Sequence, residues 1–388
     1  MSLADKPSVI MHFSVSAPGK VILHGEHSVV FGKTAIAVSL GLRSTLLFKE
    51  TSASVINIEL PSLKIKESLP LQLINKEILK YKSYIEDPEK IPHVEHLKQI
   101  ELFVKSAIFN FDNLDIKQKI SLIAVFYVVF GIFGGRELNG FDISCQSDLT
   151  IGAGTGSSAS YAVCLAGAFL QFAKGLYENE VSFDEKTLIS KWAYNCERIM
   201  HGTPSGIDNT TATFGSVVVF RKGQIPNLLD LKLKLRILLV DTQVSRQTQV
   251  LAQKVRNLME RNREALDCIM DAIDHIAKDA LKILQNLSSA NSDRDEDQYR
   301  SLAELWNMNH CLLASIGVSH PALESVRASA EKYGLGSKLT GAGGGGYAII
   351  LVPHTLDEKI VGDLTQELTS KGFNVTDAAL GGPGVLFH

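Results

Sequence analysis

The chain has 388 residues, of which 45% are hydrophobic and 21% charged, as expected for a globular protein of roughly two domains. Its formal net charge of −3, with both signs scattered, argues against nucleic-acid binding and against a polybasic membrane patch, so any cationic site must be local. Five cysteines without a CxxC pair favour buried thiols in a reducing compartment. The opening MSLADKPSVI has no signal-peptide pattern, and we expect a cytoplasmic protein.

The N-terminal segment is predicted to be rich in β-structure. Residues 12–40 alternate apolar runs with glycine and proline breaks, which predicts strand, turn and strand, and strands continue through 43–60. The Pro-Gly pair before Lys20 predicts a turn that holds this lysine at the mouth of a strand. Lys20 is then either a single cation at a site or a solvated turn lysine. His24 and His27 have HxxH spacing, but a strand end makes a metal site there a weak prediction, and a structural imidazole is favoured for His24.

Two helical regions follow. Residues 63–119 have a charged helical pattern whose polar middle, 84–96, we expect to loop outward. Residues 120–135 form an apolar run between Lys119 and Arg136. A membrane-spanning helix needs about 20 apolar residues, so this shorter run predicts a buried helix and no membrane contact.

A glycine-rich loop stands at mid-chain. A short strand at 141–148 leads into LTIGAGTGSSAS, at 149–160, and an apolar helix is predicted to start at the serines. Glycines allow close approach of the backbone, and a helix N-terminus presents free N–H groups and positive dipole to an anion. The loop lacks the lysine of a P-loop. It predicts either a phosphate cradle or a simple glycine turn with a serine cap.

Two carboxylates follow this loop. Glu197 lies on an amphipathic helix predicted at 185–202, and Asp208 in the glycine-broken loop after it. One could serve a metal while the other accepts a proton, as phosphoryl transfer requires. The alternative is that Glu197 pairs with Arg198 or Lys191 on a solvated face and that Asp208 only turns the chain.

The C-terminal part predicts a second domain. Strands at 214–225 and 235–243 bracket a polar hairpin around 227–234, and we place the domain change there, between 1–228 and 229–388. Helices are predicted at 248–287 and 299–317, separated by a polar surface loop within 286–298. A glycine loop at 340–346 then leads into a strand.

Four segments carry a family resemblance in their order along the chain. APGKVILHGEH, GAGTGSSAS, HGTPSGIDN and KLTGAGGGGYA resemble the GHMP kinase superfamily, and most closely its mevalonate kinase family, over nearly the whole chain. HGEH and HGTPSGIDN are the specific parts, because galactokinases and homoserine kinases differ there. The resemblance implies a two-domain α+β fold, with an N-terminal ATP-binding domain and a C-terminal ferredoxin-like domain around a cleft. The last few residues could return to the first domain.

The resemblance also implies an activity and its residues. The reaction would move the γ-phosphate of ATP to the primary hydroxyl of mevalonate, on the route to isoprenoids and sterols. Asp208 would be the base and Lys20 the charge stabiliser that replaces a P-loop lysine, while Ser158 and Glu197 would hold Mg²⁺. ATP would contact Lys20, Ser147, Gly152, Ala153, Gly154, Thr155, Gly156, Ser157 and Ser158. Mevalonate would contact Glu26, His27, Ser205, Asp208 and Thr248, with Arg246 nearby.

The chain departs from the family pattern at four positions. The family loop reads PPGAGLGSSAA, whereas Thr150 and Ile151 replace the prolines and Thr155 the leucine. Ser62 stands where the family often has asparagine near the adenosine. We expect these changes to affect loop rigidity, ATP affinity and contacts to the base.

The sequence alone also allows other functions on the same fold. Phosphomevalonate kinase would need an extra lysine or arginine for its second phosphate, and the HGEH and PSGIDN motifs supply none. Diphosphomevalonate decarboxylase shares the fold. A non-catalytic ligand sensor on the same fold is disfavoured by the four residues Lys20, Ser158, Glu197 and Asp208. The family further implies a homodimer and feedback inhibition by prenyl diphosphates.

Overall fold

The computed structural model describes residues 10–388 apart from 176–180, 203, 233–234, 246–247 and 290–294. Its strands are β1 (His12–His24), β2 (Ala35–Thr51), β3 (Val55–Leu60), β4 (Ile65–Pro70), β5 (Gly140–Ser147), β6 (Val217–Phe220), β7 (Asn227–Leu229), β8 (Leu235–Asp241), β9 (Ser337–Leu339), β10 (Tyr347–Val352), β11 (Asn374–Leu380) and β12 (Leu386–Phe387). Its α-helices are α1 (Leu71–Ile78), α2 (His93–Ala107), α3 (Ile116–Phe133), α4 (Ser157–Lys174), α5 (Phe183–His201), α6 (Ile207–Phe214), α7 (Thr248–Arg261), α8 (Arg263–Ser289), α9 (Asp295–Ser315), α10 (Pro321–Lys332) and α11 (Glu358–Ser370).

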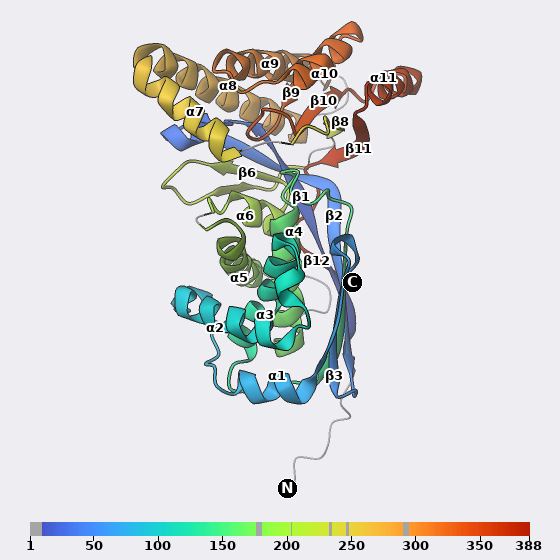
Figure 1. The fold of residues 1–388 in the computed structure, drawn as a ribbon. Helices are drawn as coiled ribbons and strands as arrows, with labels where there is room; N and C mark the ends of the chain where they lie inside the picture. The colour runs from blue at the N-terminus through green and yellow to red at the C-terminus, as the bar shows by residue number, and fades with distance from the viewer. Residues whose placement is uncertain (1–9, 176–180, 203, 233–234, 246–247, 290–294) are drawn as a thin grey trace.

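One sheet connects the two halves of the molecule. Its main path is β4-β3-β5-β2-β11-β8-β10-β9, and β2 reaches both halves because it pairs with β5, β6 and β11. In the lower half of the molecule as drawn in Figure 1, helices α1 to α6 lie on one face of the sheet. In the upper half, α7 to α11 lie around β8 to β11. The division at 228 and 229 stays a prediction, because the sheet runs continuously across it.

The apolar run at 120–135 is a core helix, as predicted. It belongs to α3, which begins earlier, where Asp115 and Gln118 form a capping box. Every residue from Ser121 to Phe133 is buried. Within the described part of the chain, α3 is the one helix long and apolar enough to span a membrane, and most of it packs inside the protein.

Three predictions about the N-terminal half were wrong. Pro18 and Gly19 form no turn; β1 continues through them with a shift of register against β2, because a bulge and a turn favour the same residue types. Residues 65–70 form β4, paired with β3, and are not helical. The segment 84–96 does not loop outward as a whole: its charged residues are exposed, but Pro88, Ile91 and His96 are buried. The carbonyl of Pro88 accepts a hydrogen bond of 2.9 Å from Asn195 Nδ2.

The polar loop predicted within 286–298 is shorter than expected. Helix α8 continues to Ser289 and α9 begins at Asp295, so both ends of the predicted loop are helical. Residues 290–294 lie outside the described residues. The hairpin predicted around 227–234 is misplaced, because residues 227–229 form β7, which pairs with β6, and the connection between these strands is 221–226. The helices predicted at 248–287 and 299–317, the strand at 235–243 and the glycine loop between β9 and β10 are confirmed in type.

The C-terminus returns to the first strand. β12 pairs with β1, and the backbone of His388 exchanges two hydrogen bonds with that of Ser14, of 2.8 and 2.9 Å. The chain end therefore lies beside the lower half of the molecule (Figure 1).

Candidate active site

A cavity of about 700 Å³ lies where β1, the start of α4, the end of α5 and the start of α6 meet. Gly341 and Ala342, from the glycine loop between β9 and β10, also line it. Of the site residues predicted from the sequence, the cavity wall contains Lys20, Ser147, Gly152, Gly154, Gly156, Ser157, Ser158, Glu197, Ser205, Asp208 and Thr248. The structure therefore brings together residues from widely separated motifs.

The mid-chain glycine loop has the geometry of an anion cradle. Gly152, Gly154 and Gly156 have φ values of 81°, 85° and 77°, which side chains rarely tolerate. Gly156 is also the N-cap of α4, and no side chain caps this helix end. The free N–H groups of the first turn, which begins at Ser157, therefore remain available to a ligand. This excludes the alternative in which a serine side chain serves as the cap.

Two predicted loop residues do not reach the cavity. Ala153 is partly buried against the apolar cluster around β8. Thr155 is buried, but its carbonyl accepts a hydrogen bond of 2.8 Å from the backbone N–H of Lys20. Thr155 thus joins the loop to β1, and contact of these two residues with ATP stays a prediction.

Lys20 and Asp208 form an ion pair at the cavity wall. Lys20 Nζ lies 3.3 Å from Asp208 Oδ1, and only 9% of the lysine side chain is exposed, against 34% of the aspartate. Asp208 lies in the first turn of α6, not in a loop as predicted.

Glu197 is a buried carboxylate beside this pair. Burial and the neighbouring Asp208 charge raise its pKa to about 8, although Ser158 and Lys20 act in the opposite direction. Its Oε1 atom is buried and has no hydrogen-bond partner. The alternative of a solvated ion pair is wrong, because Lys191 pairs with Glu89 instead.

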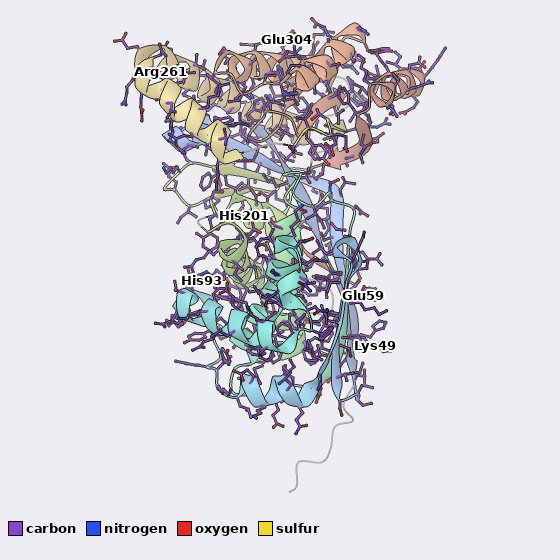
Figure 2. All side chains as sticks on the ribbon, viewed as in Figure 1. Lys49, Glu59, His93, His201, Arg261 and Glu304 are labelled. Carbon is purple, nitrogen blue, oxygen red and sulfur yellow. The ribbon has the colours of Figure 1, made fainter. Side chains whose placement is uncertain are left out.

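His201 was not singled out in the sequence, although it opens the HGTPSGIDN motif. Its Nε2 lies 3.2 Å from Ser158 Oγ and 3.8 Å from Glu197 Oε2. Figure 2 places it at the end of α5, below the junction of the two halves. Membership of the motif could have drawn attention to it.

Glu26 and His27 lie behind the cavity wall. The Glu26 carboxylate is buried, accepts a hydrogen bond of 3.1 Å from Asn309 Nδ2 and pairs with Lys338 Nζ. His27 Nε2 donates to the carbonyl of Ala342 across 2.8 Å, and burial lowers the pKa of its imidazole. Neither side chain lines the cavity, and direct contact of Glu26 and His27 with substrate stays a prediction.

The remaining predictions divide into three groups. His24 is a fully buried imidazole, as favoured from the sequence, and neither ring nitrogen has a partner. Ser62 lines the cavity, at the position where the family often has asparagine. Arg246 lies outside the described residues.

Lys117 is a lining residue that the sequence did not reveal. It stands in the first turn of α3, and its Nζ lies 3.4 Å from the carbonyl oxygen of Ile151 in the glycine loop. Lys117 belongs to none of the sequence motifs. It lies 34 positions from Ile151 in the chain, and only the folded structure brings the two together.

Known proteins resemble this chain over nearly its whole length. The family models for the GHMP kinase N-terminal domain and C-terminal region match residues 121–216 and 291–369. Mevalonate kinases of Bos taurus and Homo sapiens are each 36% identical over 386 residues, covering 96% of this chain and 94% of theirs.

A solved structure agrees as well. The mevalonate kinase of Methanococcus jannaschii superposes with a TM-score of 0.68 at 26% identity, covering 97% of this chain and 99% of that one. The predicted α+β fold of two-domain GHMP kinases is therefore confirmed. The chain belongs to the mevalonate kinase family of the GHMP kinases.

Proposed function

We propose that the protein is an ATP-dependent kinase that phosphorylates the primary hydroxyl of mevalonate, giving 5-phosphomevalonate and ADP. The observation that carries this proposal is the Lys20–Asp208 pair, 3.3 Å apart beside the uncapped N-terminus of α4. This arrangement offers a place for phosphates and a carboxylate base in one cavity. The names of the full-length relatives support mevalonate as the acceptor.

In the proposed mechanism, the chain mainly positions the reactants and stabilises charge. The glycine loop and the free N–H groups of α4 hold the phosphates of ATP, while Asp208 orients the acceptor hydroxyl and takes its proton. Since a carboxylate is a much weaker base than an alkoxide, the proton moves to Asp208 late, as the new P–O bond forms. Lys20 offsets charge that develops on the γ-phosphate during the transfer.

Ser158 and Glu197 fit a magnesium ion. Glu197 contributes a buried carboxylate oxygen without a partner, and the Ser158 hydroxyl lies next to it; both are the hard oxygen ligands that Mg²⁺ prefers. Within the described residues no group of three or more His, Cys, Asp or Glu side chains forms a metal site on its own. Phosphate oxygens of the nucleotide would therefore complete the shell. When bound, the ion supplies positive charge to the phosphates.

The alternatives inside the superfamily are less well supported. A phosphorylated acceptor would call for a further cation near Asp208. Among the described residues, the second lysine of the cavity wall, Lys117, contacts the loop at Ile151 instead. A homodimer, inhibition by prenyl diphosphates and a cytoplasmic location stay predictions.

The test is ADP release with Mg·ATP and one acceptor at a time: mevalonate, phosphomevalonate, galactose or homoserine. We expect turnover with mevalonate. Asp208→Asn should lower kcat by about 10²- to 10⁴-fold, the usual contribution of a general base, while the Kd for Mg·ATP stays close to that of the wild type.

Turnover with another acceptor would support the kinase activity but would assign it a different substrate. Binding of Mg·ATP without turnover on any acceptor would favour a ligand sensor. If Asp208→Asn retained near-normal kcat, the assignment of the base would be wrong.

A further inference from the structure

The glycine loop is contacted by lysines at both of its ends. A Cβ added at Gly156 would lie 3.0 Å from Lys20 Cγ, and one added at Gly152 would lie 3.1 Å from Lys117 Nζ. Both glycines have positive φ, so the chain there keeps bare backbone against each lysine. The two lysines come from different elements, β1 and α3.

The charges of the two lysines are not equivalent. Lys20 is largely buried and paired with Asp208, so its charge is already partly compensated. Lys117 is exposed and forms no ion pair with an acidic side chain in the described part of the chain; its hydrogen bond to the Ile151 carbonyl is long, at 3.4 Å. A free ammonium group beside a phosphate cradle attracts anions and can move to meet one.

The local sequence makes this position of Lys117 stable. Asp115 caps α3 and Gln118 completes the capping box, so the helix start is fixed. Gln118 Nε2 also donates to the carbonyl of Leu63 across 2.9 Å, which ties this helix start to the cavity wall.

We propose that Lys117 binds the non-transferred phosphates of the nucleotide, whereas Lys20 serves the phosphate that is transferred. This inference rests on the proposed kinase function. It follows from the placement of Lys117 at Gly152, at the opposite end of the loop from Gly156, where Lys20 and the Asp208 base lie. Lys117 is thus a nucleotide-binding residue, and its loss should weaken ground-state binding without slowing the chemical step.

The test uses Mg·ADP, which lacks the transferred phosphate, in calorimetric titrations at several salt concentrations. Lys117→Gln should weaken Mg·ADP binding by about 10-fold, as expected for one charged hydrogen bond, and should make the Kd less sensitive to salt. Lys117→Arg keeps the charge and should bind nearly as well as the wild type. In steady-state assays, Lys117→Gln should raise the KM for ATP and leave kcat at saturating Mg·ATP unchanged.

Two controls separate this role from others. Lys119 lies two residues further along α3 and donates to the carbonyl of Asp112 across 2.9 Å, outside the cavity, so Lys119→Gln should bind Mg·ADP like the wild type. The glutamine side chain of Lys117→Gln is one atom shorter than lysine, so the variant removes both the charge and the contact with the Ile151 carbonyl. A purely bracing role predicts a loss of Mg·ADP affinity that is the same at every salt concentration. Either that result or wild-type binding by Lys117→Gln would overturn the proposal.

Equal losses in the variants at 117 and 119 would also overturn it, because they would indicate a diffuse charge effect. The proposed substrate is tested separately: if the wild type fails to phosphorylate mevalonate but loses Mg·ADP affinity on Lys117→Gln, the nucleotide inference stands and the acceptor assignment fails.

Discussion

At the scale of single residues, the ion pair between Glu26 and Lys338 is the most deeply buried charged contact near the site. Both side chains are fully buried. Burial lowers the pKa of Lys338, while the charge of Glu26 and its hydrogen bond act in the opposite direction. Glu26 directly precedes His27, which holds Ala342 of the C-terminal glycine loop. The pair therefore positions a segment that both halves of the site share.

Removal of one partner should be costly. Lys338→Met leaves the Glu26 carboxylate buried without its cation and should lower the free energy of unfolding by about 3–5 kcal/mol, measured by urea denaturation. The double variant Glu26→Gln with Lys338→Met should recover much of that loss, because no isolated charge remains.

The control is an exposed ion pair of the same residue types. Lys66 and Glu59 lie 3.6 Å apart on the surface, and Lys66→Met should change stability by less than about 1 kcal/mol. If the variants at 338 and 66 had equal effects, the buried pair would not stabilise the protein as argued.

The sequence predicted which motif residues lie at the site better than it predicted which distant residues contact them. Lys20, Ser158, Glu197 and Asp208 meet at the cavity as expected. Ser158 and Asp208 lie at helix starts, whereas Glu197 lies near the end of α5 and Lys20 follows the register shift in β1. The burial of Glu26 was not foreseen, since the lysine that pairs with its carboxylate lies 312 positions away in the chain. Burial of a charge depends on such distant partners, and one sequence does not reveal them.

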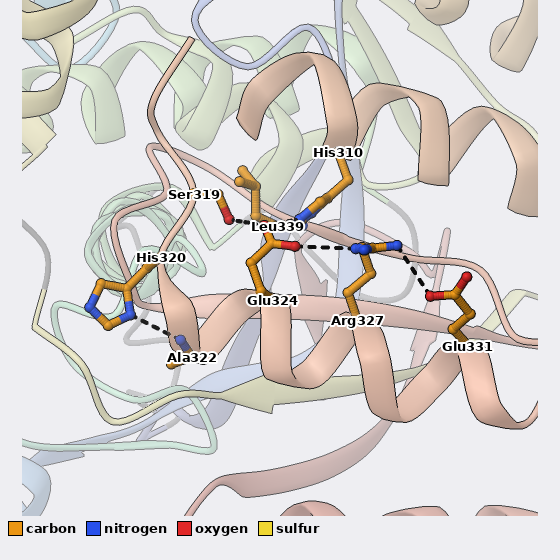
Figure 3. A network of polar contacts seen from close by, with 8 residues as sticks. All are labelled: His310, Ser319, His320, Ala322, Glu324, Arg327, Glu331 and Leu339. Atoms are coloured by element: carbon orange, nitrogen blue, oxygen red, sulfur yellow. Dashed lines mark hydrogen bonds and ion pairs between the residues drawn. The ribbon is translucent and has the colours of Figure 1, made fainter. Parts of the chain in front are cut away.

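At the scale of elements, α9, α10 and β9 are joined by a polar network around Glu324 (Figure 3). The backbone N–H of Leu339 donates to His310 Nδ1 across 3.1 Å, so the ring proton is on Nε2, which donates to Glu324 Oε1 across 2.9 Å. Ser319 and Arg327 donate to the same carboxylate. The network fixes the end of β9, immediately before the glycine loop.

This network predicts a pH dependence of stability. Burial lowers the pKa of His310 from 6.5, although Glu324 acts in the opposite direction. As the pH falls below about 6.5, the unfolded chain therefore takes up a proton that the folded protein does not, and stability decreases. Glu324 stays ionised over this range because, despite partial burial, hydrogen bonds lower its pKa to about 2.

His310→Gln should reduce this acid sensitivity. Glutamine keeps an N–H donor for Glu324 but cannot be protonated, so the fall in stability between pH 6.5 and 5 should be less steep by up to about 1.4 kcal/mol per pH unit. The measurement is urea denaturation at several pH values, with His275→Gln, on the exposed face of α8, as control. An unchanged slope in His310→Gln would contradict the neutral buried imidazole.

Element types were predictable where an apolar run is too long for a strand. Helices α3 and α4 are examples. Elements were misassigned where the same residues suit two structures. Pro18 and Gly19 suit a bulge as well as a turn, and the alternating residues of β4 are strand only because β3 lies beside them.

At the scale of the whole molecule, the last residues of the chain connect three distant parts of the fold. Gly382 accepts a hydrogen bond from Ser39 Oγ across 2.7 Å, and Arg43 donates to the carbonyls of Pro383 and Gly384 across 3.0 and 2.7 Å. The same segment packs against the end of α6, the helix whose first turn carries Asp208. The C-terminal segment, which pairs with β1, thus also holds the end of α6 in place.

Gly384 offers a matched test of this closure. A Cβ at position 384 would lie 2.1 Å from the carbonyl oxygen of Thr213, whereas a Cβ at position 382 would meet nothing within 4 Å. Gly384→Ala should therefore displace the segment from α6 and lower stability by about 1–3 kcal/mol, while Gly382→Ala should stay within about 0.5 kcal/mol of the wild type. Urea denaturation measures both.

Hydrogen exchange then distinguishes a local from a global effect. In Gly384→Ala, amides of β12 and of its partner region in β1 should lose protection together with those at the end of α6, because Val385 N–H donates to the Thr213 carbonyl across 3.0 Å. Equal protection in both alanine variants would mean that the C-terminal segment does not support α6. A loss confined to Gly384→Ala, accompanied by a lower kcat with mevalonate, would connect the chain end to the orientation of Asp208.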